Sequence, residues 1–551
     1  MRVLITWFVL LFSIAVLLSS CSAKSDGNSS ESTDNSSTED ISISSSASSS
    51  STNNANVTFG QTFQYQVTTT GTYSGTLTFS LSNHPEGMTI SSSGLIEWTP
   101  TESDQIQTYS NITITITTAS GYVFSQTFDL TVNASSATII STGVYHSCAV
   151  LDNGSVKCWG RNNYGQLGID QKNNNIGDSS GEMAQLTGIN LGTGRTATAI
   201  SVGLYHTCAL LDNASVKCWG YSSKGTLGLD NNTSPSGDYL WGGVSGEMAS
   251  LPTVILGTGR TATAISAGMY HTCALLDNAS VKCWGWNEHG QLGIDNTTDM
   301  GDDSGEMASL PTINLGTGRT ATAISAGYSH TCALLDNASV KCWGTNNYGK
   351  LGIDSTTKKG DSSGEMASLP TINLGTGRTA KSISAGNHHT CAVLDNSSVK
   401  CWGYNNTGQL GIDNTNNMGD DSGEMASLPT INLGTGRTAI SISTGNFHSC
   451  ALLDDGSVKC WGSNQYGQLG IDNSTYMGND SGEMAQLTGI NFGTGRTATA
   501  ISGGGDHSCA KLDNGAVKCW GSNQYGQLGI DNTSNMGDDP GEMASLPSVN
   551  L

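Results

Sequence analysis

The feature that most constrains the fold of this chain is a motif that occurs seven times after residue 137. It reads His-x-Cys-Ala-Leu-Leu-Asp-Asn-x-Ser-Val-Lys-Cys-Trp-Gly, and its histidine stands at positions 146, 206, 271, 330, 389, 448 and 507. The successive gaps are 60, 65, 59, 59, 59 and 59 residues, and the longest one locates an insertion near residues 238–244. A fixed period of this size is typical of repeat proteins, in which neighbouring units bury each other's apolar faces.

Each copy of the motif predicts a β-hairpin, because two strand-like runs flank an Asp-Asn turn that tolerates left-handed backbone. In the second copy, folding the hairpin about Asn213 places Cys208 opposite Cys218. Opposed residues of antiparallel strands lie close enough for a disulfide. The same spacing predicts seven disulfides: Cys148 with Cys158, Cys208 with Cys218, Cys273 with Cys283, Cys332 with Cys342, Cys391 with Cys401, Cys450 with Cys460, and Cys509 with Cys519. Of the 15 cysteines, only Cys21 stays outside these pairs.

A zinc site is the alternative interpretation of the same residues. His206, Cys208 and Cys218 are expected on one face of the hairpin and could supply three ligands with an open fourth position. Repetition of the pattern in an exported chain favours oxidised cysteines instead. We therefore expect no metal and no cofactor, and we expect each motif histidine to bond to a neighbouring backbone at the edge of its unit.

The N-terminus carries the features of an export signal. Arg2 precedes an apolar run over residues 3–18 that is too short for a stable membrane span. The run ends in Leu18-Ser19-Ser20-Cys21, which resembles the bacterial lipobox, and this resemblance implies that Cys21 becomes the lipidated first residue. We predict a lipoprotein signal peptide over residues 1–20 and an anchor that holds the protein to a bacterial membrane without spanning it. The expected location is the outer membrane, facing the exterior, and an ordinary signal peptide is the alternative.

Two further segments precede the repeats. Residues 21–56 are rich in Ser and Asn and poor in apolar residues, which predicts a disordered tether. Residues 57–135 contain short alternating strands separated by turn residues, which predicts a small β-sandwich. The stretch from His84 to Thr101 resembles the immunoglobulin- and cadherin-like domains of bacterial surface proteins. Because Asp104 and Asp129 are the only aspartates of residues 57–135, we expect a spacer without calcium.

The segment after each hairpin identifies the repeat. It reads Gly-x-Asn-x-x-Gly-Gln-Leu-Gly, complete at residues 462–470. Together with the preceding Trp-Gly and a later Gly-x-x-His, this run resembles the repeat of the regulator of chromosome condensation family over residues 137–551. The resemblance implies a seven-bladed β-propeller with four-stranded blades over residues 136–551, and hence an all-β chain. We expect residues 546–551 and 137–143 to lie together and complete one blade.

The repeated polar groups have expected structural roles. Trp159 and its equivalents are predicted to pack between blades, and Glu182 and its equivalents to make contacts near the blade junctions. The same junction role, through acidic groups or carbonyls, is predicted for Arg195, Arg260, Arg319, Arg378, Arg437 and Arg496. A catalytic site needs a unique constellation, and the sequence shows no lone nucleophile with a base, no phosphate loop and no unique acid pair. We therefore predict that the protein is not an enzyme.

Positions that vary between the repeats indicate a binding face. They precede the motif histidine or follow Trp-Gly, and both places lie at the same end of a hairpin. The candidate binding residues are Tyr145, Arg161, Tyr164, Tyr205, Tyr221, Tyr270, Trp286, His289, Tyr328, Tyr348, His388, Tyr404, Phe447, Tyr466 and Tyr525. Aromatic side chains dominate binding hot spots. The acidic loop at residues 294–306 is a second candidate, for calcium, and the insertion at residues 238–241 is a third, as an exposed apolar patch.

Charge narrows the choice of partner. Asp and Glu total 45 against 23 Lys and Arg, which gives a formal net charge of -22 without a basic patch. Such a surface disfavours nucleic acid. We expect a monomer that binds a surface or secreted protein or a glycan. The alternatives are a guanine-nucleotide exchange regulator, as the family name implies, and a structural or adhesive protein without a single ligand.

Overall fold

The computed structural model describes residues 40–43, 54–58, 62–100, 105, 107–133 and 135–551. The chain divides into two compact units, residues 1–134 (the sandwich unit) and residues 135–551 (the propeller unit). The predicted signal peptide and the predicted lipidation site, Cys21, lie outside the described residues. Among the residues that are described, no helix has the length and apolar character needed to cross a membrane.

The described residues of the sandwich unit form three sheets with one apolar core. Its strands are β1 (Asp40–Ile43), β2 (Asn54–Thr58), β3 (Phe63–Gln66), β4 (Thr69–Thr72), β5 (Thr78–Ser82), β6 (Thr89–Ile90), β7 (Leu95–Trp98), β8 (Thr108–Thr117) and β9 (Val123–Asn133). The sheet orders are β2-β9-β8-β5, β3-β7-β6 and β1-β4. Ile112, Ile114 and Ile116 alternate along β8 and are at most 1% exposed, so one face of this strand builds the core. The predicted β-sandwich is confirmed.

This unit has strands at positions before residue 57, where the sequence predicted the sandwich to start. Strand β1 lies inside residues 21–56, which were expected to form a tether, and β2 begins there and ends at Thr58. Strand β2 pairs in parallel with β9, and its Ala55 and Val57 are buried in the core. Pairing with an existing strand satisfies the backbone of β2 whatever its side chains, and composition alone therefore did not reveal it.

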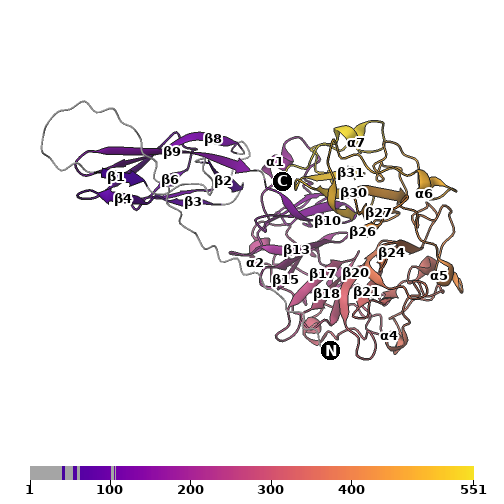
Figure 1. The fold of residues 1–551 in the computed structure, drawn as a ribbon. Coiled ribbons are helices and arrows are strands. Elements are labelled where there is room, and N and C mark those ends of the chain that lie inside the picture. The colour runs from indigo at the N-terminus through magenta and orange to yellow at the C-terminus, as the bar shows by residue number, and fades with distance from the viewer. Residues whose placement is uncertain (1–39, 44–53, 59–61, 101–104, 106, 134) are drawn as a thin grey trace, which may run out of the picture. The chain divides into compact units, whose positions relative to one another are not determined.

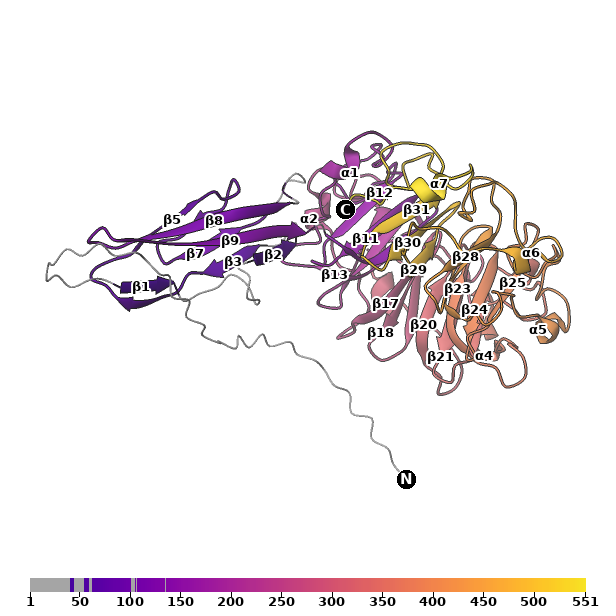
Figure 2. The ribbon, with the colours of Figure 1, turned by 45° about the horizontal axis from the view of Figure 1, so that its top comes forward.

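The propeller unit consists of seven sheets that repeat one pattern (Figures 1 and 2). The first strands are β10 (Ala137–Thr142), β13 (Ala197–Val202), β17 (Ala262–Ala267), β20 (Ala321–Ala326), β23 (Ala380–Ala385), β26 (Ala439–Thr444) and β29 (Ala498–Gly503). The second strands are β11 (His146–Leu151), β14 (His206–Leu211), β18 (His271–Leu276), β21 (His330–Leu335), β24 (His389–Leu394), β27 (His448–Leu453) and β30 (His507–Leu512). The third strands are β12 (Val156–Gly160), β15 (Val216–Tyr221), β19 (Val281–Gly285), β22 (Val340–Gly344), β25 (Val399–Gly403), β28 (Val458–Gly462) and β31 (Val517–Gly521). The all-β propeller class is confirmed.

The fourth strand of each blade is mostly absent as a regular element. In six sheets it is reduced to a single bridge, such as Gly285 with Met300. Only the second sheet has a fourth strand, β16 (Leu240–Trp241), which the insertion supplies. A one-turn helix follows in each repeat: α1 (Glu182–Gln185), α2 (Glu247–Ser250), α3 (Glu306–Ser309), α4 (Glu365–Ser368), α5 (Glu424–Ser427), α6 (Glu483–Gln486) and α7 (Glu542–Ser545). Short 3-10 helices η2 (Ser223–Gly225) and η3 (Asn347–Gly349) complete the elements.

All seven predicted disulfides are present. Each joins directly opposed residues of the second and third strands, as Cys148 and Cys158 do with a Cα–Cα distance of 4.1 Å. The other six pairs repeat this arrangement. The cysteines are at most 1% exposed, so the pairs lie inside the packed sheets. The zinc alternative is therefore wrong for these residues.

Polar side chains join each sheet to the next around the ring. The Ser141 hydroxyl accepts a hydrogen bond from the backbone N–H of Val202 in the next first strand. Equivalent serine hydroxyls bond at the other six junctions, ending with Ser502 and Thr142. The first strands contact one another in succession, and β29 contacts β10. The ring is thus closed by the same contacts that join its interior sheets.

Each motif histidine joins two sheets through a hydroxyl group. His146 Nε2 lies 2.8 Å from Thr207 Oγ1 of the next sheet, and the Thr207 hydroxyl donates to the Gln166 carbonyl. His507 closes the series on Ser147. The expected bond to a neighbouring backbone is therefore wrong, because the hydroxyl stands between the imidazole and the carbonyl. Since that hydroxyl uses its own proton on the carbonyl, it accepts the Nε2–H of a neutral histidine.

The tryptophans pack at the same junctions, as predicted. Trp219 is fully buried, and its indole N–H donates to the Gln166 carbonyl at 3.1 Å. Five other equivalents donate in the same way. Trp284 is the exception, since its indole N–H has no partner in the described part of the chain; the residue at the glutamine position of the preceding repeat is Thr226, whose carbonyl accepts the Thr272 hydroxyl.

The two ends of the propeller unit meet, but they do not share a blade. The backbone N–H of Ala137 donates to the Gly515 carbonyl, and that of Val549 donates to the Val517 carbonyl. Both ends therefore contact the seventh sheet. Strand β10, however, belongs to the first sheet, and residues 546–551 add no strand. In every interior repeat the residues equivalent to 546–551 and 137–143 form one segment that connects a sheet to the next. The two ends of the propeller unit therefore meet between the seventh and first sheets.

Candidate binding face

The hairpin geometry gathers the variable positions at one end of each sheet. His146 pairs with Gly160 across the first hairpin, so the residues just outside this pair are neighbours. The backbone N–H of Arg161 donates to the Tyr145 carbonyl at 3.0 Å. The same bond joins Trp286 to Tyr270 in the third sheet. Because the sheets surround one axis, these pairs form an annulus, which we call the binding face.

The first aromatic cluster of the binding face spans four sheets. Its members, joined by ring contacts, are Tyr145, Tyr164, Tyr205, Tyr221, Tyr270, Trp286, His289 and Tyr525. Tyr205 lies at the centre, with its ring centroid 4.8 Å from that of Tyr164 and 6.1 Å from that of Tyr145. Such contacts add about 0.5–1.5 kcal/mol per pair beyond burial. The rings therefore hold one another in place and present a preformed surface.

Arg161 contacts rings of this cluster on both sides of the junction between the seventh and first sheets. Its guanidinium carbon lies 4.8 Å from the ring centroid of Tyr525 and 5.1 Å from that of Tyr145. It also lies 5.4 Å from the ring of Tyr205. Attraction between a cation and aromatic faces fixes the side chain. Burial raises the pKa of Tyr270 to about 12, so this phenol stays neutral at physiological pH.

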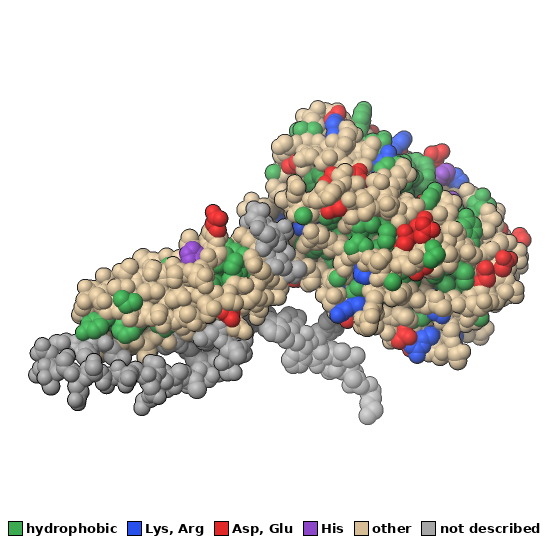
Figure 3. Space-filling view, turned by 90° about the horizontal axis from the view of Figure 1, so that it is seen from above, with side chains coloured by type: hydrophobic (Ala, Val, Ile, Leu, Met, Phe, Trp, Pro, Cys, Tyr) green, Lys and Arg blue, Asp and Glu red, His purple; other side chains and the backbone are tan. Residues whose placement is uncertain are grey.

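The second aromatic cluster lies on the fourth, fifth and sixth sheets. Its members are Tyr328, Tyr348, His388, Tyr404 and Phe447. Burial and the nearby Lys350 ammonium lower the pKa of His388 to about 4, so its ring is neutral here. Thirteen of the fifteen candidate residues thus belong to the two clusters, Arg161 is joined to the first cluster through its guanidinium group, and Tyr466 makes none of these ring contacts. Figure 3 shows hydrophobic and acidic side chains sharing the exposed surface of the propeller unit.

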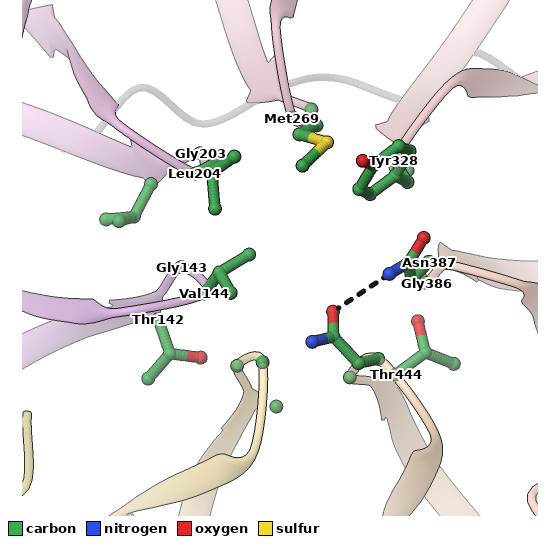
Figure 4. A pocket seen from close by; sticks show the side chains of 18 of the residues that line it. Thr142, Gly143, Val144, Gly203, Leu204, Met269, Tyr328, Gly386, Asn387 and Thr444 are labelled. Carbon is green, nitrogen blue, oxygen red and sulfur yellow. Dashed lines mark hydrogen bonds between the residues drawn. The ribbon is translucent and has the colours of Figure 1, made fainter. Parts of the chain in front are cut away.

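A central pocket opens on the axis inside the annulus. It has a volume of about 120 Å³ and is lined by the residue two positions before each motif histidine (Figure 4). Val144, Leu204 and Met269 make one side apolar, whereas Asn387 and Asn446 make the other side polar. The two amides bond to each other at 3.3 Å. These positions are among the variable ones that the sequence placed on the binding face, although only Tyr328 of them was chosen as a candidate binding residue.

A second pocket lies at the outer part of the face, and the sequence did not reveal it. Its volume is about 290 Å³. Two of its walls, Tyr404 and Phe447, were candidates. The remaining lining residues are Asn406, Thr407, Ser463, Gln465, Tyr476 and Asp506. Asp506 was among the variable positions that the sequence placed on this face, whereas Tyr476 could have been found because four other repeats have Asn or Asp at its position.

The acidic loops have structural partners. In the calcium candidate, Glu306 Oε2 accepts three backbone N–H bonds from residues 301–303 of its own loop. Asp295 accepts two backbone N–H bonds at the start of α4 in the next repeat. Asp299 accepts the N–H of Asn287 and pairs with Lys224. In the described part of the chain, no three His, Cys, Asp or Glu side chains are close enough to share a metal ion.

The predicted junction partners of the arginines are acidic. Arg319 pairs with Asp336 of the next hairpin turn at 3.1 Å, and the other five arginines pair similarly. Within residues 238–241 of the insertion, Leu240 and Trp241 are buried in the second sheet, and Tyr239 is the one exposed apolar side chain, at 60%. The expectation of an exposed apolar patch there is therefore wrong beyond one side chain, because β16 pairs with β15.

Comparison with known proteins agrees with this geometry. A family model described as RCC1-like domain matches residues 243–551, which is more than half of the chain. The chain belongs to the RCC1-like domain family. A model of the regulator of chromosome condensation (RCC1) repeat also matches residues 137–166 and 197–226, and a model named "Putative Ig domain" matches residues 41–133.

Relatives of this RCC1-like chain differ in what accompanies the propeller. The ultraviolet-B receptor UVR8 of Arabidopsis thaliana is 28% identical over 395 residues, which cover 71% of this chain and 78% of the receptor. The human E3 ubiquitin-protein ligase HERC2 is 26% identical over 398 residues, which cover only 7% of HERC2. This chain therefore shares only the RCC1-like part of the ligase. Among solved structures, yeast RCC1 (Prp20) bound to Kap60 matches with a TM-score of 0.53 at 19% identity, covering 74% of this chain and 84% of that one, which supports the fold alone.

Proposed function

We propose that this protein is a non-enzymatic binding module, held outside a bacterial cell by a lipid on Cys21, that recognises a protein partner with the binding face of its propeller. The observation that carries the proposal is the pair of aromatic clusters on that face. Thirteen residues that differ between repeats join into preformed surfaces, whereas the residues common to all repeats serve the junctions between sheets.

The composition of the face favours a protein partner. Tyrosine, tryptophan and arginine are the residues in which interface binding energy concentrates. The rings already contact one another, so binding orders few side chains and loses little conformational entropy. The net charge of -22 repels nucleic acid and directs the face toward partners with basic surface.

The disulfides and the N-terminal motif favour an exterior location. Seven buried disulfides persist in an oxidising compartment and are rare in a reducing one. A lipid on Cys21, followed by polar residues, would hold the propeller at a membrane surface. Intact mass of the membrane-extracted protein tests this part, because an unmodified N-terminus would contradict the anchor.

The test of the binding proposal is quantitative cross-linking on intact cells that display the full chain. The first variant is Tyr205→Ala, which removes the centre of the first cluster. The second is Tyr348→Asn, which removes a 43% exposed ring at a position with φ 63° that asparagine tolerates. The control is Tyr239→Ala, an exposed tyrosine of the insertion. We expect partner capture to fall about ten-fold or more in the first two variants and to stay unchanged in the control. Equal capture by all three variants would overturn the proposal.

A further inference from the structure

The second pocket is built where the sixth and seventh repeats depart from the pattern of the others. Asp506 occupies the position just before the motif histidine, where the other repeats place three tyrosines, a phenylalanine, a histidine and a serine. It is therefore the only carboxylate at this position of the annulus. Its backbone carbonyl still accepts the N–H of Ser522, as the equivalent carbonyls do in the other repeats. The aspartate therefore changes the side chain at this position and leaves the backbone hydrogen bond in place.

Tyr476 is a second departure, and it costs a hydrogen bond. In four other repeats the equivalent residue is Asn or Asp, and its side-chain oxygen accepts a backbone N–H from the loop after Trp-Gly. In the fifth repeat this bond joins Asn417 to Asn405 at 3.0 Å. A tyrosine side chain is too long to make the same local bond. The sixth repeat gives up that bond and gains an aromatic wall for the pocket.

The carboxylate of Asp506 has no cationic partner in the described part of the chain. No hydrogen bond or ion pair engages it, and burial raises its pKa. The imidazole of His388, which stacks on Phe447, is neutral because burial and Lys350 lower its pKa to about 4. The six arginines of the junctions are paired elsewhere. A half-buried carboxylate without a cation is a costly group unless a ligand supplies the charge.

The other walls suit the same ligand. Phe447 and Tyr404 contact each other edge to face, with their centroids 6.2 Å apart, and Phe447 stacks on His388 at 5.1 Å. With Tyr476 they give the pocket three aromatic sides beside one carboxylate. Aromatic faces attract cations, and a cage of such rings is a recurrent site for ammonium groups. The volume of about 290 Å³ accommodates a side chain of lysine size.

We propose that this pocket binds the alkylammonium end of a lysine side chain on the partner protein, with Asp506 as the counter-ion and Tyr404, Phe447 and Tyr476 as the aromatic walls. This inference rests on the proposed function, since it names the chemistry that one part of the binding face recognises. The amide groups of Asn406 and Gln465 at the rim are available to the partner's backbone. The overall acidity of the chain favours the approach of such a basic surface.

The experiment uses the full oxidised chain and saturation-transfer NMR with Nα-acetyl-lysine methylamide as the probe. We expect saturable binding with a Kd of about 1–10 mM, as is ordinary for a ligand of this size. The matched neutral probe is Nα-acetyl-norleucine methylamide, and we expect it to bind about ten-fold more weakly or not at all. Asp506→Asn should weaken the lysine probe about ten-fold, whereas Asp421→Asn, at an exposed loop carboxylate, should not. Tyr476→Asn, which restores the consensus residue, should also weaken binding while the protein stays folded.

Three results would overturn the inference: no saturable binding of the lysine probe, equal binding of the norleucine probe, or equal binding by Asp506→Asn. Preferential saturation of N-acetylglucosamine at the same rings would instead assign the pocket to a neutral sugar. The proposed function is tested separately, because the cross-linking experiment depends on Tyr205 and Tyr348, which do not line this pocket. If the wild-type chain does not bind the lysine probe but still captures its partner, the lysine pocket is rejected and the proposed binding function stands.

Discussion

Lys350 is the buried group whose replacement should change stability most clearly. It occupies the position of Gln166 and Gln291 in the repeat, and it is 2% exposed. Its ammonium group has one bond, to the Asn387 carbonyl at 3.3 Å. Burial lowers its pKa from 10.5 to about 8. We predict that Lys350→Gln stabilises the propeller at neutral pH.

The size of the effect follows from the charge and from three hydrogen bonds. A pKa lowered from 10.5 to about 8 corresponds to about 3 kcal/mol at neutral pH, at about 1.4 kcal/mol per pKa unit. A glutamine would also accept the backbone N–H of Tyr348, as Gln291 does for His289 at 3.0 Å. That gain of about 1 kcal/mol is offset because the Asn387 carbonyl loses its donor and the glutamine Nε2 stays unpaired, as in Gln291. The net expectation is about 2–3 kcal/mol.

Thermal unfolding at several pH values measures this difference. Between pH 8 and pH 10.5 the unfolded chain holds a proton on Lys350 that the folded chain has released, so wild-type stability rises with pH in this window. The advantage of Lys350→Gln should therefore be largest below pH 8 and should disappear above pH 10.5. At pH 7 we expect a Tm increase of about 2–4 °C. Lys381→Gln, at an exposed lysine bonded to Ser397, is the control and should show no such trend. A destabilised Lys350→Gln, or an advantage that does not change with pH, would refute the reasoning.

Three further predictions concern the junctions and hairpins. Burial lowers the pKa of His271 from 6.5 to about 3, and it also lowers the pKa of the other motif histidines. The unfolded chain therefore binds more protons than the folded chain below pH 6.5, and the Tm should fall steadily from pH 6.5 toward pH 3. A Tm that does not change over this range would contradict the neutral buried imidazoles. Replacing Cys332 and Cys342 together by alanine should cost about 2–3 kcal/mol in chemical denaturation by the chain-entropy model, and an unchanged midpoint would show that packing alone holds the hairpin. Arg319→Ala breaks an exposed pair with Asp336 that solvent screens, so the unfolding free energy should stay nearly unchanged, and a clear loss would mean that the pair organises the turn.

Local features of this protein could be predicted because their partners are close in sequence. The hairpin about Asn213 has a short turn of known chemistry, and its register fixes Cys208 opposite Cys218 before any tertiary contact is considered. Repetition made the prediction stronger, since the same register had to hold seven times. Recognition of the repeat then gave the propeller class.

For contacts between repeats, the sequence predicted which residues make them but not which partners they meet. The tryptophans and arginines were correctly placed at junctions, because a residue common to all repeats must serve a common need. The histidine was assigned the wrong partner, since His146 and Thr207 are 61 residues apart and nothing local relates them. The expected shared blade at the ends failed for a similar reason, because sequence periodicity does not say where one sheet stops and the next begins.

The sequence by itself thus determined the seven hairpins, their disulfides and the end of each hairpin at which variable residues gather, since all of these depend on strand pairing over a few residues. The tertiary structure decided which of those residues meet. Tyr205 contacts Tyr145 and Tyr270 of its two neighbouring sheets, and Arg161 of the first repeat contacts Tyr525 of the seventh. The pocket around Asp506 likewise needs walls from the fifth, sixth and seventh repeats. Closure of the ring sets the spacing of the sheets, and that spacing is a property of the packed whole that no single repeat contains.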